Sequence, residues 1–184
     1  MAQPRSSFAV LAALAALATF AEVSQAKDGP PVYAVKATFL YKFEPYVTWP
    51  GPASATAANT FNICVVGDDP FGRLLDQAVS SERVGGRPIL VRRLGAVDRG
   101  QGCQIVYLTG SRTQSVADAL RSVRGSPVLT VTDADSSANT KGIIHFVVRD
   151  NRVRFEIDDQ AAAQNGLVIS SKLLSLALST RPRS

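Results

Sequence analysis

The sequence predicts a single α/β domain: a mixed, largely parallel sheet flanked by helices, with an antiparallel hairpin and further helices at the C-terminal end. Three observations predict it. The 184 residues fit one domain of ordinary size. Helix-like and strand-like apolar patterns alternate through the middle of the chain. A hydrophobic fraction of 46% against 19% charged residues excludes a disordered or collagen-like chain.

Residues 1–26 have the layout of a secretory signal peptide. Arg5 gives a short positive region, residues 8–21 are a continuous apolar run, and 24–26 supply a small-x-small cleavage site. The apolar run is too short for a comfortable membrane span, and the alternative is an uncleaved N-terminal anchor. The mature chain, from Lys27, is therefore expected to be soluble and exported, which in a bacterium means periplasmic.

The domain begins with a helix and a buried strand. Apolar residues recur at helical spacing over 32–43, interrupted by Lys36, and Pro45 should end that helix. Residues 60–66 (TFNICVV) are mostly apolar and predict a buried strand.

Strands and helices then alternate. Asp69 followed by Pro70 is a helix-start pattern, which predicts a helix over 70–80. The later elements are expected as strands over 87–93, 104–108 and 127–131 and an amphipathic helix over 111–123. Because strands that alternate with helices usually pair in parallel, these segments predict the largely parallel sheet.

The C-terminal third changes to an antiparallel hairpin. Residues 143–149 and 152–158 flank Asp150–Asn151, a two-residue turn that tolerates positive φ. With that turn, one face of the hairpin consists of matched apolar pairs, which stabilise antiparallel strands. The expected pairs are Ile144 with Ile157, Phe146 with Phe155, and Val148 with Val153.

Two short helices should follow the hairpin. Asp158–Asp159 is expected to cap the first, and Asn165–Gly166 to stop it. Ser170 or Ser171 should cap a last helix that runs to about Leu178.

The other face of the hairpin is predicted to be polar and open. His145 should lie opposite Glu156, beside Arg152 and Arg154. A neighbouring carboxylate favours the charged imidazole, so the pair His145 and Glu156 is a candidate pH switch that titrates near periplasmic pH. The alternative is a structural cross-strand pair.

Cys64 and Cys103 are an even pair in a chain expected to be exported. An oxidising compartment favours a disulfide between them, which would close a loop of about 40 residues and contribute about 4 kcal/mol. The alternatives are two buried free thiols or a redox-active role, although there is no CxxC motif to support redox catalysis.

Composition narrows the function classes. One His and two Cys are too few ligands for a zinc ribbon or a His-cluster metalloenzyme. The net charge is +5 and the pI about 9.6, but the arginines are scattered rather than interleaved with aromatic residues. We therefore expect no nucleic-acid partner. The basic residues form either a solvated surface or a face that docks an acidic partner or anionic headgroups.

The sequence offers few residues from which a catalytic site could be assembled. His145 with Ser170 or Ser171 is the one hydrolytic triad that could be assembled, and the sequence has no nucleophile elbow, so we expect no catalytic centre. Trp49, with Phe43 and Tyr46, is either core or the wall of a pocket for a small aromatic ligand.

Four aspartates follow the first and fourth predicted strands. They are Asp68, Asp69, Asp133 and Asp135. The carboxyl ends of parallel strands are where α/β proteins bind ligands, so these carboxylates are either a Mg²⁺ or Ca²⁺ site or simple caps and turns. The second interpretation is preferred, and no metal or cofactor is expected.

Four blocks in order along the chain form a distinctive set. They are residues 36–43 (KATFLYKF) with 47–50 (VTWP); 67–72 (GDDPFG); 128–133 (VLTVTD) with 142–146 (GIIHF); and 155–158 (FEID) with Ala161, 166–167 (GL), 169–174 (ISSKLL) and 176–177 (LA). Each block is weak alone, but together they span almost the whole mature chain. In this set the chain resembles the YfiR-like family of periplasmic proteins.

The resemblance implies a regulator that acts by binding. The family's namesake is a soluble periplasmic repressor that holds an inner-membrane diguanylate cyclase inactive through its periplasmic domain and so lowers cyclic-di-GMP output. An outer-membrane, peptidoglycan-binding lipoprotein sequesters it, and members tend to form homodimers with an α/β fold. The chain departs from the family pattern at Ala138 and His145, which replace a frequent second cysteine pair, and at Gln164 and Val168, which replace basic residues.

The resemblance and the hairpin pattern together predict a partner-binding surface on the open hairpin face and the following helix. Its expected members are Arg152, Arg154, Glu156, Ala162 and Gln164. The competing interpretation is a periplasmic small-molecule binding module that uses the crevice after Asp68 and Asp133.

Overall fold

The computed structural model of the protein describes residues 30–51, 59–133 and 140–183. The strands in these ranges are β1 (Val47–Thr48), β2 (Phe61–Gly67), β3 (Arg83–Val84), β4 (Arg87–Leu94), β5 (Ile105–Gly110), β6 (Leu129–Thr132), β7 (Ile144–Arg149), β8 (Arg152–Asp158), β9 (Val168–Ile169) and β10 (Thr180–Arg181). The helices are α1 (Pro30–Lys42), α2 (Arg73–Val79), α3 (Val116–Ser122), α4 (Asp159–Gln164) and α5 (Ser171–Leu174), with a 3-10 turn η1 (Glu44–Tyr46). The expected signal peptide lies outside the described residues.

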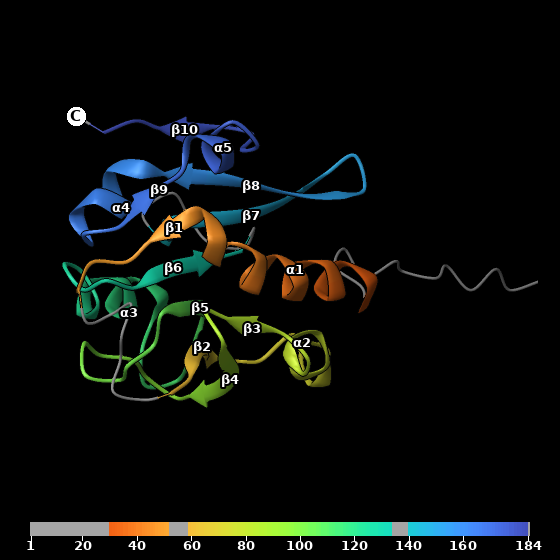
Figure 1. The fold of residues 1–184 in the computed structure, drawn as a ribbon. Helices are drawn as coiled ribbons and strands as arrows, with labels where there is room; N and C mark the ends of the chain where they lie inside the picture. Colours follow the sequence, from red (N-terminus) through yellow and green to blue (C-terminus); the bar gives the residue numbers. More distant parts are fainter. Residues whose placement is uncertain (1–29, 52–58, 134–139, 184) are drawn as a thin grey trace, which may run out of the picture.

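Eight strands form one mixed sheet in the order β10-β8-β7-β6-β5-β2-β4-β3, and β1 pairs with β9 in a separate ribbon (Figure 1). Strands β4, β2, β5, β6 and β7 are mutually parallel, whereas β8 runs antiparallel to β7 and β3 antiparallel to β4. The five parallel strands have the order of a doubly wound sheet, in which the second strand along the chain lies outside the first. The predicted α/β class, with its largely parallel sheet and C-terminal hairpin, is confirmed.

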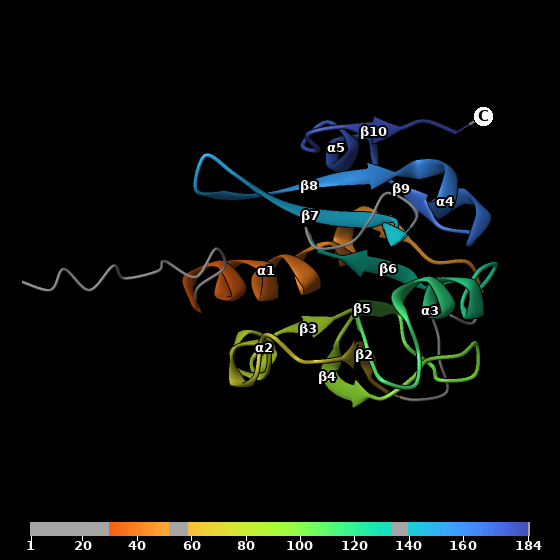
Figure 2. The same ribbon diagram turned by 180° about the vertical axis from the view of Figure 1, so that it is seen from behind.

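The two faces of the sheet are covered unequally. On one face α1, α2, α5 and the β1–β9 ribbon enclose the main apolar core, which includes Leu40, Phe61 and Phe146. On the other face α3 packs over β2 and β5, where Cys64 and Ala119 belong to a smaller cluster. Figures 1 and 2 show α1 and α3 on opposite sides of the sheet. Among the described residues, no helix packs an apolar face on this second side of β6, β7 and β8.

The hairpin has the predicted register. Ile144 pairs with Ile157, Phe146 with Phe155, and Val148 with Val153. Asp150 and Asn151 form the turn with φ of 51° and 57°, the left-handed conformation that such a two-residue loop requires.

Helix boundaries depart more from expectation. Asp69 does not cap α2: its Oδ1 accepts a hydrogen bond from the backbone N–H of Phe71 at 2.8 Å, and the helix begins later, after Gly72. α3 begins only after its cap Ser115, and α5 ends at Leu174 instead of continuing to about 178. Asp158 and Ser170 do cap α4 and α5, as predicted.

Candidate partner-binding surface

The tip of the β7–β8 hairpin is a cationic, solvent-exposed surface. Arg149 pairs with Arg152 next to the turn, and Arg154 lies one step inward, opposite Val147. All three arginines are exposed. Within the described part of the chain, the guanidinium groups of Arg152 and Arg154 have no hydrogen-bond or ion-pair partner. These two predicted contact residues are therefore accessible to an acidic surface.

Glu156, further along the same face, is half-buried and already paired. Lys141 Nζ donates to its Oε2 at 2.6 Å. This hydrogen bond is the main cause that lowers the pKa of Glu156, so the carboxylate is ionised at neutral pH. A partner that binds Glu156 would have to share or displace Lys141.

His145 lies opposite Glu156 as predicted, but it is not on an open surface. It is 3% exposed, and its Nδ1 lies 3.0 Å from Thr132 Oγ1. Burial is the largest effect on the imidazole and, together with Lys141, lowers its pKa; Glu156 acts in the raising direction but is outweighed. The net direction is thus opposite to that expected for the switch pair, because lost hydration exceeds the attraction of one ion-paired carboxylate.

The two remaining predicted contact residues, Ala162 and Gln164, both lie on α4, but only one of them is exposed. Ala162 is completely buried in the main core, so it cannot touch a partner, and its place in the predicted surface is corrected. The physical reason is the turn of α4: Asp158 accepts a hydrogen bond from the N–H of Ala161 at 2.8 Å, which directs Ala162 inward. Gln164 is exposed at the end of this helix.

A groove joins these elements on the uncovered half of the sheet. A cavity of about 370 Å³ lies between α3, α4 and β10, and a second of about 230 Å³ lies beside His145, Glu156 and Ser179. The two cavities share Lys141, Asp158 and Arg181 in their walls, so they adjoin; together they are called the polar groove below. Gln164 lines the larger of the two cavities and Glu156 the smaller. Sequence reasoning missed this groove because its lining comes from elements that only the topology brings together.

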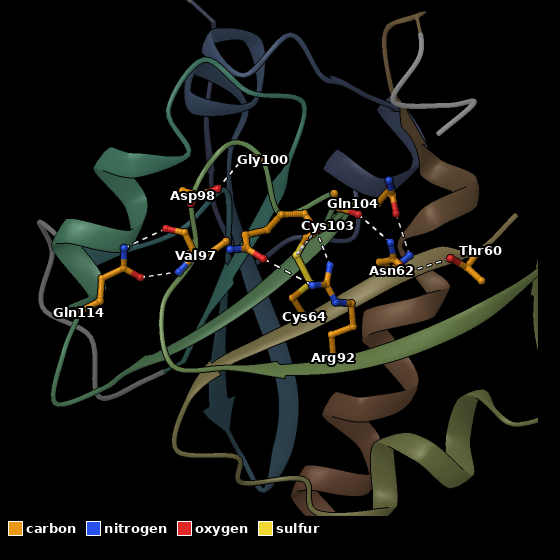
Figure 3. The surroundings of a disulfide bond; sticks show 12 residues. Thr60, Asn62, Cys64, Arg92, Val97, Asp98, Gly100, Cys103, Gln104 and Gln114 are labelled. Carbon is orange, nitrogen blue, oxygen red and sulfur yellow. Dashed lines mark hydrogen bonds between the residues drawn. A yellow bond between two sulfur atoms is a disulfide. The ribbon is translucent and has the colours of Figure 1, made fainter. Parts of the chain in front are cut away.

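The cysteines are joined. Cys64 on β2 and Cys103, just before β5, form a disulfide with Cα atoms 5.9 Å apart. Both are buried, at 0% and 5% exposure. Figure 3 shows that the bond fastens the segment between β4 and β5 to the central strand β2.

Hydrogen bonds fasten the same segment at both ends (Figure 3). Asn62 donates its Nδ2 to Gly102 O at 2.8 Å, and its backbone N–H donates to Gln104 Oε1 at 2.7 Å. Gln114 holds the other end, with its Nε2 and Oε1 bound to the backbone of Val97 at 2.9 and 2.8 Å. The disulfide therefore belongs to a closed, stabilised loop, which agrees with a structural role.

Asp69 and Asp133, two of the four aspartates considered as an alternative cation site, are held in ion pairs instead. Asp133 is bound by Lys36, whose Nζ lies 3.0 and 2.8 Å from its two oxygens, and by Tyr107 OH at 2.6 Å. Asp69 is bound by Arg93 Nε at 2.7 Å. Asp68 lies on the surface, and Asp135, like Ala138, is outside the described residues. No group of three or more His, Cys, Asp or Glu suited to a metal ion occurs among the described residues.

Lys36 is the cation that neutralises the Asp133 carboxylate. Its side chain has no exposed surface, although lysine is seldom buried. The signal was present in the sequence as the one charged residue that interrupts the apolar spacing of the first helix. Such an interruption indicates a buried cation that requires a carboxylate partner.

The hydrolytic triad is not formed. Ser170 caps α5, where its Oγ accepts a hydrogen bond from the N–H of Leu173 at 3.3 Å. This helix packs through Leu173 into the main core, on the face of the sheet opposite to His145. Trp49 is 8% exposed and packs edge-on against Phe61, which confirms its interpretation as core.

Fold and surface together define a class: an α/β domain whose accessible features are a cationic hairpin tip and a polar groove, and whose described helices include none long and apolar enough to cross a membrane. Residues 33–178 match the family model described as YfiR/HmsC-like. The chain belongs to this family, and the predicted resemblance is confirmed. No curated protein gives a significant match to it.

Proposed function

We propose that the protein is an exported regulator that represses an inner-membrane diguanylate cyclase by binding its periplasmic domain, and so lowers cyclic-di-GMP signalling and biofilm formation. Membership of the YfiR/HmsC-like family over residues 33–178 is the observation that carries the proposal. The protein acts by binding and performs no catalysis.

Export follows from the N-terminal segment. Residues 1–26 are removed as a signal peptide, and the mature protein works in the periplasm. The Cys64–Cys103 disulfide supports this location, because such bonds persist in oxidising compartments and are rare in the cytosol.

The contact surface for the cyclase comprises Arg152, Arg154, Glu156 and Gln164. Exposed arginines such as Arg152 and Arg154, whose guanidinium groups have no partner among the described residues, can steer an acidic surface into contact and bind carboxylates in bidentate pairs. Repression requires that the protein bind the inactive state of the cyclase domain more tightly than the active state, since only this difference shifts the equilibrium.

Two further interactions belong to the same proposal. The protein forms a homodimer, and an outer-membrane, peptidoglycan-binding lipoprotein withdraws it from the cyclase. Light scattering of the purified protein tests the first. Competition of the purified lipoprotein for the cyclase domain tests the second.

The decisive experiment is a pull-down from detergent-solubilised membranes of the source bacterium, with the oxidised exported protein as bait and mass spectrometry as the readout. Arg154→Glu is the test variant. Arg83→Glu, at an exposed position on β3 at the far edge of the sheet, is the matched control. Recovery of a diguanylate cyclase by the wild type and by Arg83→Glu, with loss for Arg154→Glu, supports the proposal. Recovery of no cyclase by the wild type contradicts it.

A further inference from the structure

The second face of the sheet, on which α3 packs, changes from apolar to polar beyond the area that α3 covers. Val106 on β5 belongs to the apolar cluster under α3, and its neighbour across the ladder is Thr130 on β6. Further along, Thr132 pairs with His145, and His145 with Glu156. This side of the sheet is therefore apolar under α3 and polar over β6, β7 and β8. Figure 2 shows β7 and β8 from this side with no labelled helix in front of them.

Internal hydrogen bonds hold the walls of the polar groove in place. Asn165, at the end of α4, is buried; its Nδ2 donates to Val128 O at 3.0 Å, and its Oδ1 accepts from the N–H of Gly125 at 2.9 Å. These bonds fasten α4 to the segment that leaves α3. The two helices that wall the groove are therefore held at a fixed separation.

Positive charge predominates along the groove. Four cations line it against two carboxylates. The cations are Arg121, Arg124, Lys141 and Arg181, and the carboxylates are Glu156 and Asp158.

The four cations differ in how far they are already paired: Arg121 is paired with Asp118, and Lys141 with Glu156 at 2.6 Å. Arg181 reaches Asp158 only at 3.4 Å, with 68% of its side chain exposed, and such pairs contribute at most about 1 kcal/mol. Within the described residues Arg124 has no side-chain partner. A ligand that brings carboxylates can therefore engage Arg124 and Arg181 without breaking a strong internal interaction, and it would share Arg121 and Lys141 with Asp118 and Glu156.

From this arrangement we infer that the polar groove binds an extended acidic segment of a protein partner. The inference rests on the proposed function, in which the partner is the periplasmic part of the cyclase, and it adds Arg121, Arg124, Lys141 and Arg181 to the binding surface.

The arrangement favours an extended peptide over other anions. The cations come from three parts of the chain, namely α3 with the turn that follows it, the segment that leads into β7, and β10, so they are spread along two adjoining cavities rather than directed at one point. A single phosphate would engage only some of them. A membrane surface is flat and cannot enter a recess walled by two helices, whereas a chain with several carboxylates can follow it.

The experiment measures binding of a fluorescein-labelled oligoglutamate peptide to the oxidised exported protein by fluorescence anisotropy. The test variant combines Arg124→Glu with Arg181→Gln, both at exposed positions. The control combines Arg73→Glu with Arg83→Glu, which are also exposed but lie on α2 and β3, away from the groove. Circular dichroism checks that both variants fold.

We expect the test variant to bind about tenfold more weakly and the control to stay within about twofold of the wild type, with affinity that falls as salt is added. Equal losses in both variants, or no binding to the wild type, would overturn the inference. Inorganic phosphate that displaces the peptide as well as unlabelled oligoglutamate does would also overturn it, in favour of a small-anion site.

The membrane pull-down separates this inference from the proposed function. If the wild type captures a cyclase and the groove variant captures it equally well, the groove is excluded while the proposed function stands. If the wild type captures no cyclase but oligoglutamate binding still depends on Arg124 and Arg181, the proposed function fails. The groove then remains a site for acidic segments of another partner.

Discussion

Lys36 Nζ lies 2.8 Å from Asp133 Oδ2, and the lysine side chain is completely buried. The two residues are 97 positions apart in the sequence: Lys36 is in the middle of α1, and Asp133 directly follows β6. Tyr107 of β5 donates to the same carboxylate oxygen at 2.6 Å. The pair therefore fastens the first helix to the carboxyl ends of two central strands.

Replacing one member of this pair should be strongly destabilising. Lys36→Met keeps an unbranched side chain only one atom shorter but removes the cation that neutralises the Asp133 carboxylate, which is 14% exposed. Removal of one partner from a buried pair costs about 3–5 kcal/mol. We expect a loss of about 3 kcal/mol for Lys36→Met in urea unfolding, against about 1 kcal/mol for Tyr107→Phe, which removes the hydrogen bond from Tyr107 OH to Asp133.

The double variant Lys36→Met with Asp133→Asn is the control for this interpretation. Because it removes both charges, it should be more stable than the sum of the two single changes implies. Strict additivity would mean that Lys36 and Asp133 do not act as a pair.

The Cys64–Cys103 disulfide should contribute most of its stability through the unfolded chain. It joins residues 39 positions apart, and loop closure of that length corresponds to about 4 kcal/mol. The variant with Cys64→Ala and Cys103→Ala should unfold at a urea concentration lower by the equivalent of about 3–4 kcal/mol. Because both sulfurs are buried, the native wild type should also resist reduction by dithiothreitol until urea is added. Rapid reduction without urea would indicate a redox-responsive bond instead.

His145 should make the protein less stable as the pH falls below neutrality. Burial and Lys141 lower its pKa in the folded state below the ordinary value of about 6.5. As the pH falls through about 6.5, the unfolded chain binds a proton that the folded protein does not, so the free energy of unfolding decreases until the folded-state pKa is reached. His145 is the only histidine in the sequence, so a ¹H–¹³C NMR titration of its ring gives the midpoint directly.

Two variants check this assignment. His145→Gln should lose most of the change in stability between about pH 5 and 7. Glu156→Gln should lower the midpoint of His145 further, because the carboxylate acts to raise it. A midpoint above 6.5 in the wild type would mean that Glu156 dominates, as the sequence alone suggested.

The contrast between Phe146 and His145 explains what sequence could and could not predict. The register of the hairpin follows from period-two alternation and a two-residue turn, so Phe146 opposite Phe155 could be predicted. The burial of His145 could not, because it depends on pairing with β6 and on Lys141, and no local pattern reports either. The candidate site divides in the same way: Arg152 and Arg154 follow from strand parity, whereas Ala162 required the direction in which α4 leaves β8.

Local sequence patterns also could not predict the short strands that form by pairing with distant segments of the chain. The β1–β9 ribbon pairs Val47 with Ile169, and β10 joins the sheet edge by pairing Thr180 with Ile157. Two-residue strands carry no periodicity of their own. The polar groove, bounded by β10 through Arg181, was missed for that reason.

The close approach of β2 and β5 should make Gly67 intolerant of any side chain. Its φ is +98°, and a Cβ at this position would overlap the carbonyl oxygen of Gly110. Gly85→Ala is the matched control, since that glycine has a φ of +55° but nothing within 4 Å of an added Cβ. A left-handed φ alone costs about 1–2 kcal/mol and overpacking a further 1–3 kcal/mol, so we expect a loss of about 2–5 kcal/mol for Gly67→Ala and about 1–2 kcal/mol for Gly85→Ala. Equal losses in urea unfolding would show that backbone conformation, and not the contact with Gly110, selects glycine at the end of β2.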